Sequence, residues 1–180
     1  MTTWRQMHPS DLPSVMRIAN EIHHALPETE AVFRERLHLY PGGCFVLVND
    51  GSDDNKAGIG GYVISFPIRH GKPPALNAML GEIPADADQY YLHDLAILPG
   101  FRGRGAARDG IGRVLGVARG LGYRMCCLIS VYGTVPFWKK FGFEPEPGQV
   151  DEVMMEKLRG YGEEATYLVR RNTMLGVLGS

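Results

Sequence analysis

The sequence predicts a single α/β domain, called α+β in some schemes, in which a central mixed β-sheet is flanked by helices. Three observations support this prediction. Segments with the helical period of apolar residues alternate along the chain with segments of strand character. The stretch "YRMCCLISV" is almost continuously apolar, as in a strand covered on both faces. The chain has 180 residues, 44% of them hydrophobic, which is enough for one core, and no repeat or linker divides residues 1–180.

The N-terminal part is expected to form a strand followed by two helices. Residues Trp4 to Met7 give the strand, Ser10 is expected to cap the first helix, and Pro13 is tolerated in its first turn. The apolar positions of this helix are Leu12, Val15, Met16, Ala19 and Ile22. A second helix is expected from Thr29 to Tyr40, ended by "PGG". Its buried stripe is Val32, Phe33, Leu37 and Tyr40.

The next segments indicate a hairpin and a long connection. "CFVLVND" and "IGGYVISF" flank the polar stretch "GSDDNKAG", which is typical of a β-hairpin. Residues 67–88 contain four prolines and are expected to be partly irregular. Two interpretations of this connection stay open: a substrate lid and a disordered insertion.

The C-terminal half continues the alternation of strands and helices. The strand "YYLHDLAIL" stops at Pro99, and a helix is expected from Ala106 to Gly120. Its apolar face is Ile111, Val114, Leu115, Ala118 and Leu121. The strand "YRMCCLISV" follows, then a short helix in "GTVPFWKKFGF" ending at Gly142, and a last strand in "EATYLVRR". Met154 and Met155 are expected to fill gaps in the core.

Charge and composition exclude several classes of protein. The net charge of −1 and the pI near 6.6 give no general attraction to nucleic acid or to an anionic membrane. No apolar run approaches the roughly 20 residues that span a bilayer, and no signal peptide is apparent, so we expect a cytoplasmic protein. Cys44, Cys126 and Cys127 suggest buried free thiols, and no metal site is expected because His23 and His24 lack a second ligand pair.

The turn "FRGRGAA" between a strand and a helix predicts an anion site. The first amides of a helix have no internal partners, and the positive end of its dipole lies there. Gly103 and Gly105 let the backbone approach a ligand closely, and Ala106 and Ala107 keep the first turn free of bulk. The surrounding arginines are Arg102, Arg104, Arg108, Arg113, Arg119 and Arg124, opposed nearby only by Asp109. We expect a phosphate-bearing ligand; the alternative is an ordinary turn beside a solvated helix face.

The residues of this turn exclude two common phosphate sites. A P-loop needs a lysine, and the turn has none. A dinucleotide fingerprint needs a third glycine where Arg108 stands. Gly110, Gly112 and Gly116 inside the helix each cost up to about 1 kcal/mol relative to alanine, so we expect close packing against them.

Two motifs resemble those of the GCN5-related N-acetyltransferases. Arg102-x-x-Gly105-x-Ala107 fits the signature [QR]-x-x-G-x-[GA], and "PFWKKFGFEP" resembles the family segment F-Y-x-K-x-G-F. The resemblance implies a splayed sheet, with a cofactor core at about residues 90–145. It also implies acetyl-coenzyme A (acetyl-CoA) as cofactor, bound through its pyrophosphate by the turn. The implied cofactor-binding residues are Leu95, Ala96, Ile97, Arg102, Gly103, Arg104, Gly105, Ala106, Ala107 and Phe137.

The implied reaction is transfer of an acetyl group to a primary amine of a small molecule or peptide, by direct attack. An alkyl ammonium with pKa near 10.4 must lose a proton at a cost of about 4 to 5 kcal/mol at pH 7, so a base is expected. His93 is the first candidate, with Tyr91 on the same strand face; Asp94 points to the other face unless a β-bulge intervenes.

The general acid departs from the family pattern, because Trp138 stands where many members have tyrosine. Tyr132 is the substitute candidate; alternatively it only packs, or no protein acid is needed. Cys126 lacks an adjacent base in the sequence. The alternative functions are a noncatalytic CoA-binding module and, from the arginine-rich helix, a nucleic-acid binder. A homodimer is compatible with the sequence, which leaves the acceptor and the tail "NTMLGVLGS" unassigned.

Overall fold

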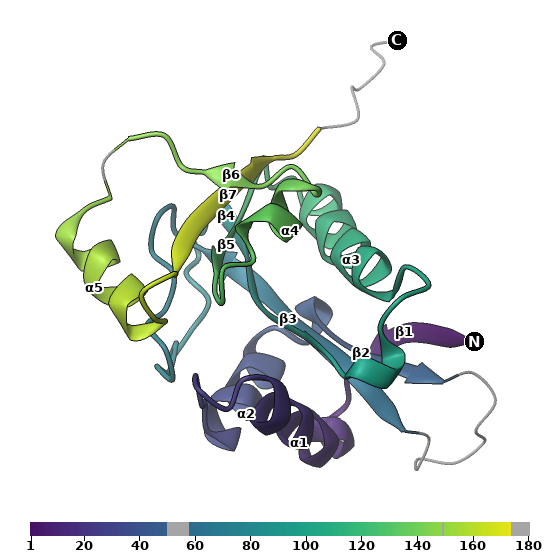
Figure 1. The fold of residues 1–180 in the computed structure, drawn as a ribbon. Helices are drawn as coiled ribbons and strands as arrows, with labels where there is room; N and C mark the ends of the chain where they lie inside the picture. The colour runs from purple at the N-terminus through teal and green to yellow at the C-terminus, as the bar shows by residue number, and fades with distance from the viewer. Residues whose placement is uncertain (50–57, 149, 174–180) are drawn as a thin grey trace, which may run out of the picture.

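The chain folds around one seven-stranded sheet with the strand order β1-β2-β3-β4-β5-β7-β6 (Figure 1). The computed structural model describes residues 1–49, 58–148 and 150–173. The strands are β1 (Thr2–Gln6), β2 (Cys44–Asn49), β3 (Ile59–Ile68), β4 (Gln89–Ile97), β5 (Met125–Ser130), β6 (Glu144–Pro145) and β7 (Thr166–Arg171). Strands β4 and β5 pair in parallel, and the other neighbours pair antiparallel. The predicted mixed α/β architecture is confirmed.

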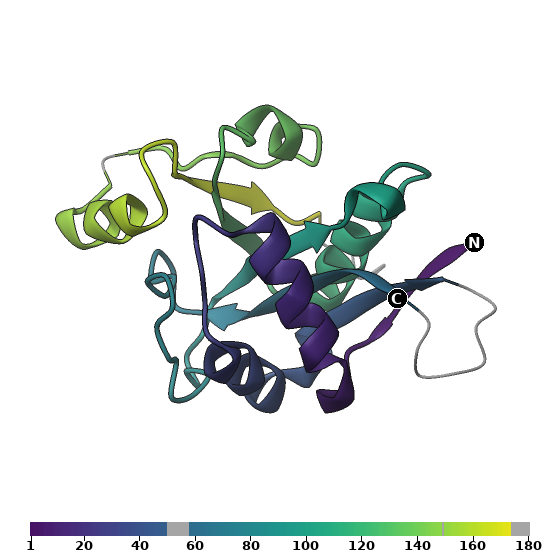
Figure 2. The same cartoon turned by 60° about the horizontal axis from the view of Figure 1, so that its bottom comes forward.

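Helices cover both faces of the sheet, as Figure 2 shows for α1. Helices α1 (Leu12–Ile22) and α2 (Glu30–Leu39) share one apolar cluster with the sheet. Helices α3 (Ala106–Gly120) and α4 (Val135–Lys139) belong to the cluster on the other face. The helical periods read from the sequence therefore bury the faces that they predict, and α3 has the predicted bounds. Among the described residues no helix has the length and apolarity needed to cross a bilayer.

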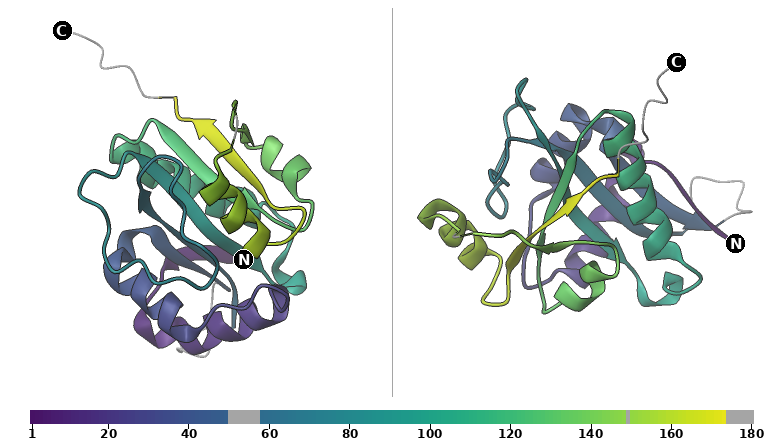
Figure 3. Two further views of the ribbon diagram at one scale, coloured as in Figure 1. Left: turned by 90° about the vertical axis from the view of Figure 1, so that its left-hand side faces the viewer. Right: turned by 90° about the horizontal axis from the view of Figure 1, so that it is seen from above.

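The long connection between β3 and β4 packs beside the last helix, α5 (Glu152–Gly160) (Figure 3). It is irregular, as the prolines predict, with isolated turns over residues 69–88. The hydroxyl of Tyr161, just after α5, donates a hydrogen bond to the carbonyl of Pro74 at 3.0 Å. This packing places the connection against the domain and argues against a disordered insertion. The polar stretch of the predicted β2–β3 hairpin and most of the C-terminal tail lie outside the described residues.

Two predicted helix ends are wrong. Ser10 lies in a 3₁₀ turn (Pro9–Asp11), and Asp11 is the residue that precedes α1. The Asp11 carboxylate accepts the amide of His8 at 2.8 Å, which fixes this turn and displaces the cap from Ser10. Helix α4 ends at Lys139 rather than Gly142, because Gly142, with φ +80°, closes the turn that follows.

Two predicted core positions are also wrong. Leu121 is exposed because α3 ends one residue earlier, at Gly120. Met155 is exposed while Met154 is buried, since successive residues on α5 point about 100° apart. All three cysteines are buried and free, as predicted.

Candidate functional site

A cleft opens where the parallel strands β4 and β5 separate. Tyr90 pairs with Cys126 and Tyr91 with Cys127, and the pairing then ends, although both strands continue. Beyond this point lies a cleft of about 460 Å³. It reaches from Arg102 at the glycine-rich turn to the loop after β5, and its walls include Leu95, Ala96, Ile97, Ala107 and Phe137. The cofactor residues that the resemblance implies on β4 therefore line one cleft with part of the turn.

The turn before α3 presents backbone donors. Gly103 and Gly105 have φ of +86° and +84°, a conformation that glycine adopts without strain, and Arg104 between them also has a positive φ, of +50°. Their three amides donate no hydrogen bond to any residue that the structure describes. Gly105 precedes the first residue of α3, so these amides lie at the positive end of the helix dipole. The turn thus offers amides without a partner among the described residues at the place where the sequence predicts an anion site.

Side chains from distant elements fix the position of this turn. The Arg102 Nε donates to the carbonyl of Ile97 at 2.9 Å, which joins the turn to the end of β4. The indole of Trp4 on β1 donates to the carbonyl of Ala106 at 2.9 Å, and its ring covers Gly110. The packing expected against Gly110 is confirmed. It is wrong for Gly112 and Gly116, where a Cβ would meet nothing within 4 Å.

A β-bulge on β4 turns two polar residues toward the same side. The pairing with β3 shifts between Ile64–Asp94 and Ser65–Leu92, leaving His93 as the extra residue. Without the bulge His93 and Asp94 would point to opposite faces. In the structure both line the cleft. The β-bulge that the sequence analysis allowed as a possibility is therefore present.

His93 is held almost entirely inside the protein. Its side chain is 2% exposed, and its Nε2 lies 2.8 Å from Oε1 of Glu28. Its Nδ1 is buried without a hydrogen-bond partner among the described residues. Tyr91, the other predicted residue on this face, is fully buried and does not line the cleft. Burial would raise the pKa of Glu28, but His93 and the amide of Asn77 hold it below its ordinary value.

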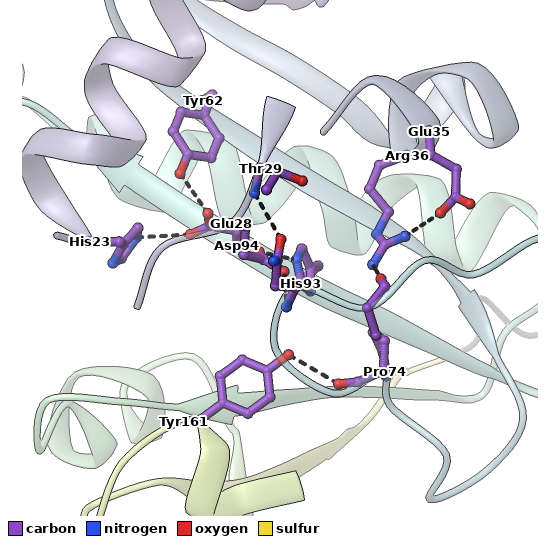
Figure 4. Close-up of polar contacts among 12 residues, drawn as sticks. His23, Glu28, Thr29, Glu35, Arg36, Tyr62, Pro74, His93, Asp94 and Tyr161 are labelled. Carbon is purple, nitrogen blue, oxygen red and sulfur yellow. Dashed lines mark hydrogen bonds and ion pairs between the residues drawn. The ribbon is translucent and has the colours of Figure 1, made fainter. Parts of the chain in front are cut away.

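His23 and Asp94 form a second pair, in a less enclosed position (Figure 4). His23 Nε2 lies 2.9 Å from Asp94 Oδ1, an ion pair outside the ideal hydrogen-bond direction. The Tyr62 hydroxyl donates to the same carboxylate at 2.5 Å. Burial would raise the pKa of Asp94, but the nearby His23 lowers it. Burial would lower the pKa of His23, but Asp94 raises it.

Tyr132 lies beside this pair at the mouth of the cleft. Its ring stacks on His23, with centroids 5.9 Å apart and an interplanar angle of 7°. It is 47% exposed and lines the cleft together with Trp138. Burial and the carboxylate of Asp94 raise the pKa of Tyr132. The phenol proposed from the sequence is therefore near the charged pair, whereas the Trp138 indole packs on Phe143.

A smaller side chamber adjoins the cleft. It has a volume of about 50 Å³, and it shares His23, His93, Asp94, Ile129 and Val131 with the cleft. Its other walls come from α1, the α1–α2 loop, α2, the 67–88 connection and Tyr161. Elements that are far apart in the chain thus meet around two carboxylates and two imidazoles.

No sequence motif indicates that His23 lies in the cleft. It follows the last residue of α1 and is 71 positions from Asp94, so no spacing rule connects the two. The available signal was a histidine at the end of an amphipathic helix, and only a known fold could place it near β4. Glu28 lies in the α1–α2 loop, and no sequence motif marks it either.

The comparisons with known proteins agree with this architecture. The family model described as the acetyltransferase (GNAT) family matches residues 5–143. No curated protein sequence matches the chain significantly.

Solved structures share the fold at low sequence identity. The NatC complex bound to Gag peptide and CoA has a TM-score of 0.70 and 15% identity, covering 96% of this chain and 99% of that one. N-acetylglutamate synthase from Neisseria gonorrhoeae, complexed with coenzyme A and N-acetylglutamate, has a TM-score of 0.68 and 19% identity over 96% of this chain and 35% of that one. The GNAT-like decarboxylase GphF, in complex with isobutyryl-CoA, has a TM-score of 0.67 and 18% identity over 95% of this chain and 100% of that one.

Proposed function

The chain belongs to the acetyltransferase (GNAT) family, and from this premise we propose that it transfers the acetyl group of acetyl-CoA to a primary amine. One observation carries the proposal. A single cleft, lined at one end by Arg102 and Ala107, connects a turn whose backbone amides have no partner among the described residues with a histidine–carboxylate pair. The first end suits a diphosphate, and the second suits a reaction that needs a proton removed.

The cofactor would lie along the cleft. The amides of residues 103–105 and the positive helix terminus suit the pyrophosphate, and Arg102 adds charge beside them. The backbone of Leu95, Ala96 and Ile97, with Phe137 in the same cleft, would hold the pantetheine arm of the cofactor. Acetyl-CoA supplies the acetyl group as a thioester. The same backbone would donate to the thioester carbonyl oxygen, which becomes negatively charged during the attack. Fixed donors of this kind are usually the largest catalytic contribution. That CoA or isobutyryl-CoA is bound in structures with this fold supports the assignment.

For the proton of the amine, we propose His23 as the acceptor in place of His93. A base must touch the substrate, and the His23 side chain is 16% exposed whereas that of His93 is 2% exposed. Asp94 orients the His23 ring and stabilises its charged form, as a carboxylate does for a catalytic imidazole. His93 then has a positioning role, because its ion pair holds Glu28 in the wall of the side chamber.

Tyr132 is the proposed proton donor to the leaving thiolate. Its position beside His23 in the cleft supports this role, and burial keeps its phenol protonated by raising its pKa. A thiol with a pKa near 8.5 leaves readily, so the contribution of a protein acid is expected to be small. Trp138 supports the alternative of a noncatalytic CoA-binding module, because its indole cannot donate a proton to the thiolate.

Thermal unfolding with different ligands tests the proposal first. Acetyl-CoA and CoA should raise the melting temperature, because selective binding stabilises the folded state by about 2.7 kcal/mol at one hundred times Kd. ATP, NADH and a short oligonucleotide should not. Thiol release in the presence of amines then separates an enzyme from a CoA-binding module. A stabilisation by the oligonucleotide alone would favour the nucleic-acid alternative.

A further inference from the structure

The side chamber has the position and size of a binding site for the reacting end of a small acceptor. It shares five residues with the cleft, including His23 and Asp94, so a ligand in it reaches the proposed base. One water needs roughly 10–15 Å³, and the chamber measures about 50 Å³, which leaves room for on the order of four non-hydrogen atoms. An unbranched amine fits this space better than an amine flanked by a side chain and a peptide group.

The charges around the chamber favour a cation and disfavour an anion. Glu28 and Asp94 both line it, and both have a pKa below the ordinary value because each pairs with a histidine. No lysine or arginine among the described residues lines the chamber. Both histidines of the chamber already pair with these carboxylates, so a ligand carboxylate would find no lysine or arginine among the described lining residues to pair with.

The remaining walls are largely apolar. Two of them carry a polar group: Asn20, and Tyr161, whose hydroxyl already donates to the carbonyl of Pro74. The others are Ala19, Leu26, Pro27, Phe33, Leu76, Ile129 and Val131. A peptide amine would bring a carbonyl and an amide whose burial without partners is unfavourable. His93 lines the chamber, and its buried Nδ1 has no partner among the described residues. This buried nitrogen favours a ligand that carries a polar group over a purely apolar one.

Hydrogen bonds fix the outer wall that keeps the chamber small (Figure 4). The amide of Asn77 donates to Glu28 Oε2 at 2.9 Å, and the amide of Thr29 donates to Asn77 Oδ1 at 2.8 Å. The buried Arg36 donates to the carbonyl of Ala78 at 2.5 Å. Leu76, between Pro74 and Asn77, is thus held across the chamber from β4.

We propose that the side chamber selects a compact primary amine with an uncharged apolar substituent, and rejects free amino acids and peptide amino termini. The proposal rests on the function proposed above, because it assigns the acceptor of that reaction. It identifies the substrate class by a cationic head, an apolar body and the absence of a carboxylate.

Acceptor competition in the full chain tests the proposal. We would measure kcat/KM by thiol release at saturating acetyl-CoA with n-butylamine, 4-aminobutyrate, L-alanine and trialanine amide. Butylamine should exceed each of the other three at least tenfold. Equal or better use of 4-aminobutyrate, alanine or the peptide overturns the inference while the transferase function stands. Thiol release with none of the four, with acetyl-CoA still stabilising the fold, also overturns it. Failure of acetyl-CoA to bind refutes the proposed function itself.

A variant of the chamber wall gives a second test. Leu76→Ala enlarges the chamber, so the ratio of kcat/KM for 2-phenylethylamine to that for butylamine should rise about fivefold or more. Met79→Ala is the matched control, since Met79 is an exposed residue of the same connection outside the chamber wall. An unchanged ratio in Leu76→Ala, with acetyl-CoA binding retained, contradicts the placement of the acceptor.

Discussion

The two ends of the cleft are built in different ways. The turn at residues 102–107 offers backbone amides in a conformation set by glycines, and its arginines are largely exposed. At the other end, side chains from β4 and the α1–α2 loop form two histidine–carboxylate pairs. Amides do not titrate, whereas the pair of His23 and Asp94 depends on the protonation of the imidazole. Ligand binding at the turn should therefore be less sensitive to pH than catalysis at the pairs.

The largest expected effect comes from removing the less buried histidine. His23→Gln should lower kcat about 100-fold or more, because positioned bases contribute roughly 10² to 10⁴ in rate. The melting-temperature shift with CoA should stay, since the turn is unaffected. His24→Gln, an exposed neighbour, is the control. Should His93→Gln abolish turnover while His23→Gln retains it, the base would be His93, as the sequence first suggested.

The pH dependence of His23→Gln tests the difference between the two ends of the cleft. The pKa of His23 is raised above its ordinary 6.5 by Asp94. The stabilisation from the charged imidazole is complete below pH 6.5 and is lost as the pH rises through the raised pKa. Over that range kcat should increase, because the neutral imidazole is the base. His23→Gln should remove both the pH dependence of the stability and that of kcat over this range. A CoA dissociation constant that followed the same titration would break the distinction between the two ends.

A smaller effect is expected at the turn. Arg102→Ala should weaken CoA binding about tenfold, since a charge-assisted contact contributes roughly 1.5 kcal/mol and the end of β4 loses its tie to the turn. Calorimetric titration with CoA measures this, and kcat at saturating cofactor should change little. Arg119→Ala, at the other end of α3, makes the same charge change away from the site. Equal weakening in both variants would mean that general charge, and not this contact, holds the ligand.

This contrast also explains what the sequence could predict. The turn is contiguous, and the order of strand, glycines and amphipathic helix carries its geometry, so the position of the turn and the bounds of α3 were predictable. The arrangement of the histidine–carboxylate pairs at the other end of the cleft depends on the fold. The pairing of Asp94 with His23 needs a bulge of one residue at His93 and the end of α1 beside it. No local pattern encodes either, because both result from packing between elements far apart in the chain.

The final prediction tests whether the conformation of the turn depends on residues outside 102–107. Gly110 and Gly112 are two residues apart on α3, and alanine has the same helix propensity at both. A Cβ on Gly110 would lie 2.7 Å from the Trp4 ring, so Gly110→Ala should lower the free energy of unfolding by about 1 to 3 kcal/mol. Gly112→Ala meets nothing within 4 Å and should raise it by up to about 1 kcal/mol.

Chemical denaturation measures both changes, and CoA titration of the two variants gives them a functional meaning. Trp4 also holds the Ala106 carbonyl, so a displaced ring should loosen the start of α3 and weaken CoA binding in Gly110→Ala alone. If Gly110→Ala loses stability yet binds CoA as tightly as Gly112→Ala, the turn keeps its conformation without Trp4. Its geometry would then be a property of residues 102–107 themselves. Weaker binding would show that even the local end of the cleft depends on a residue of the first strand.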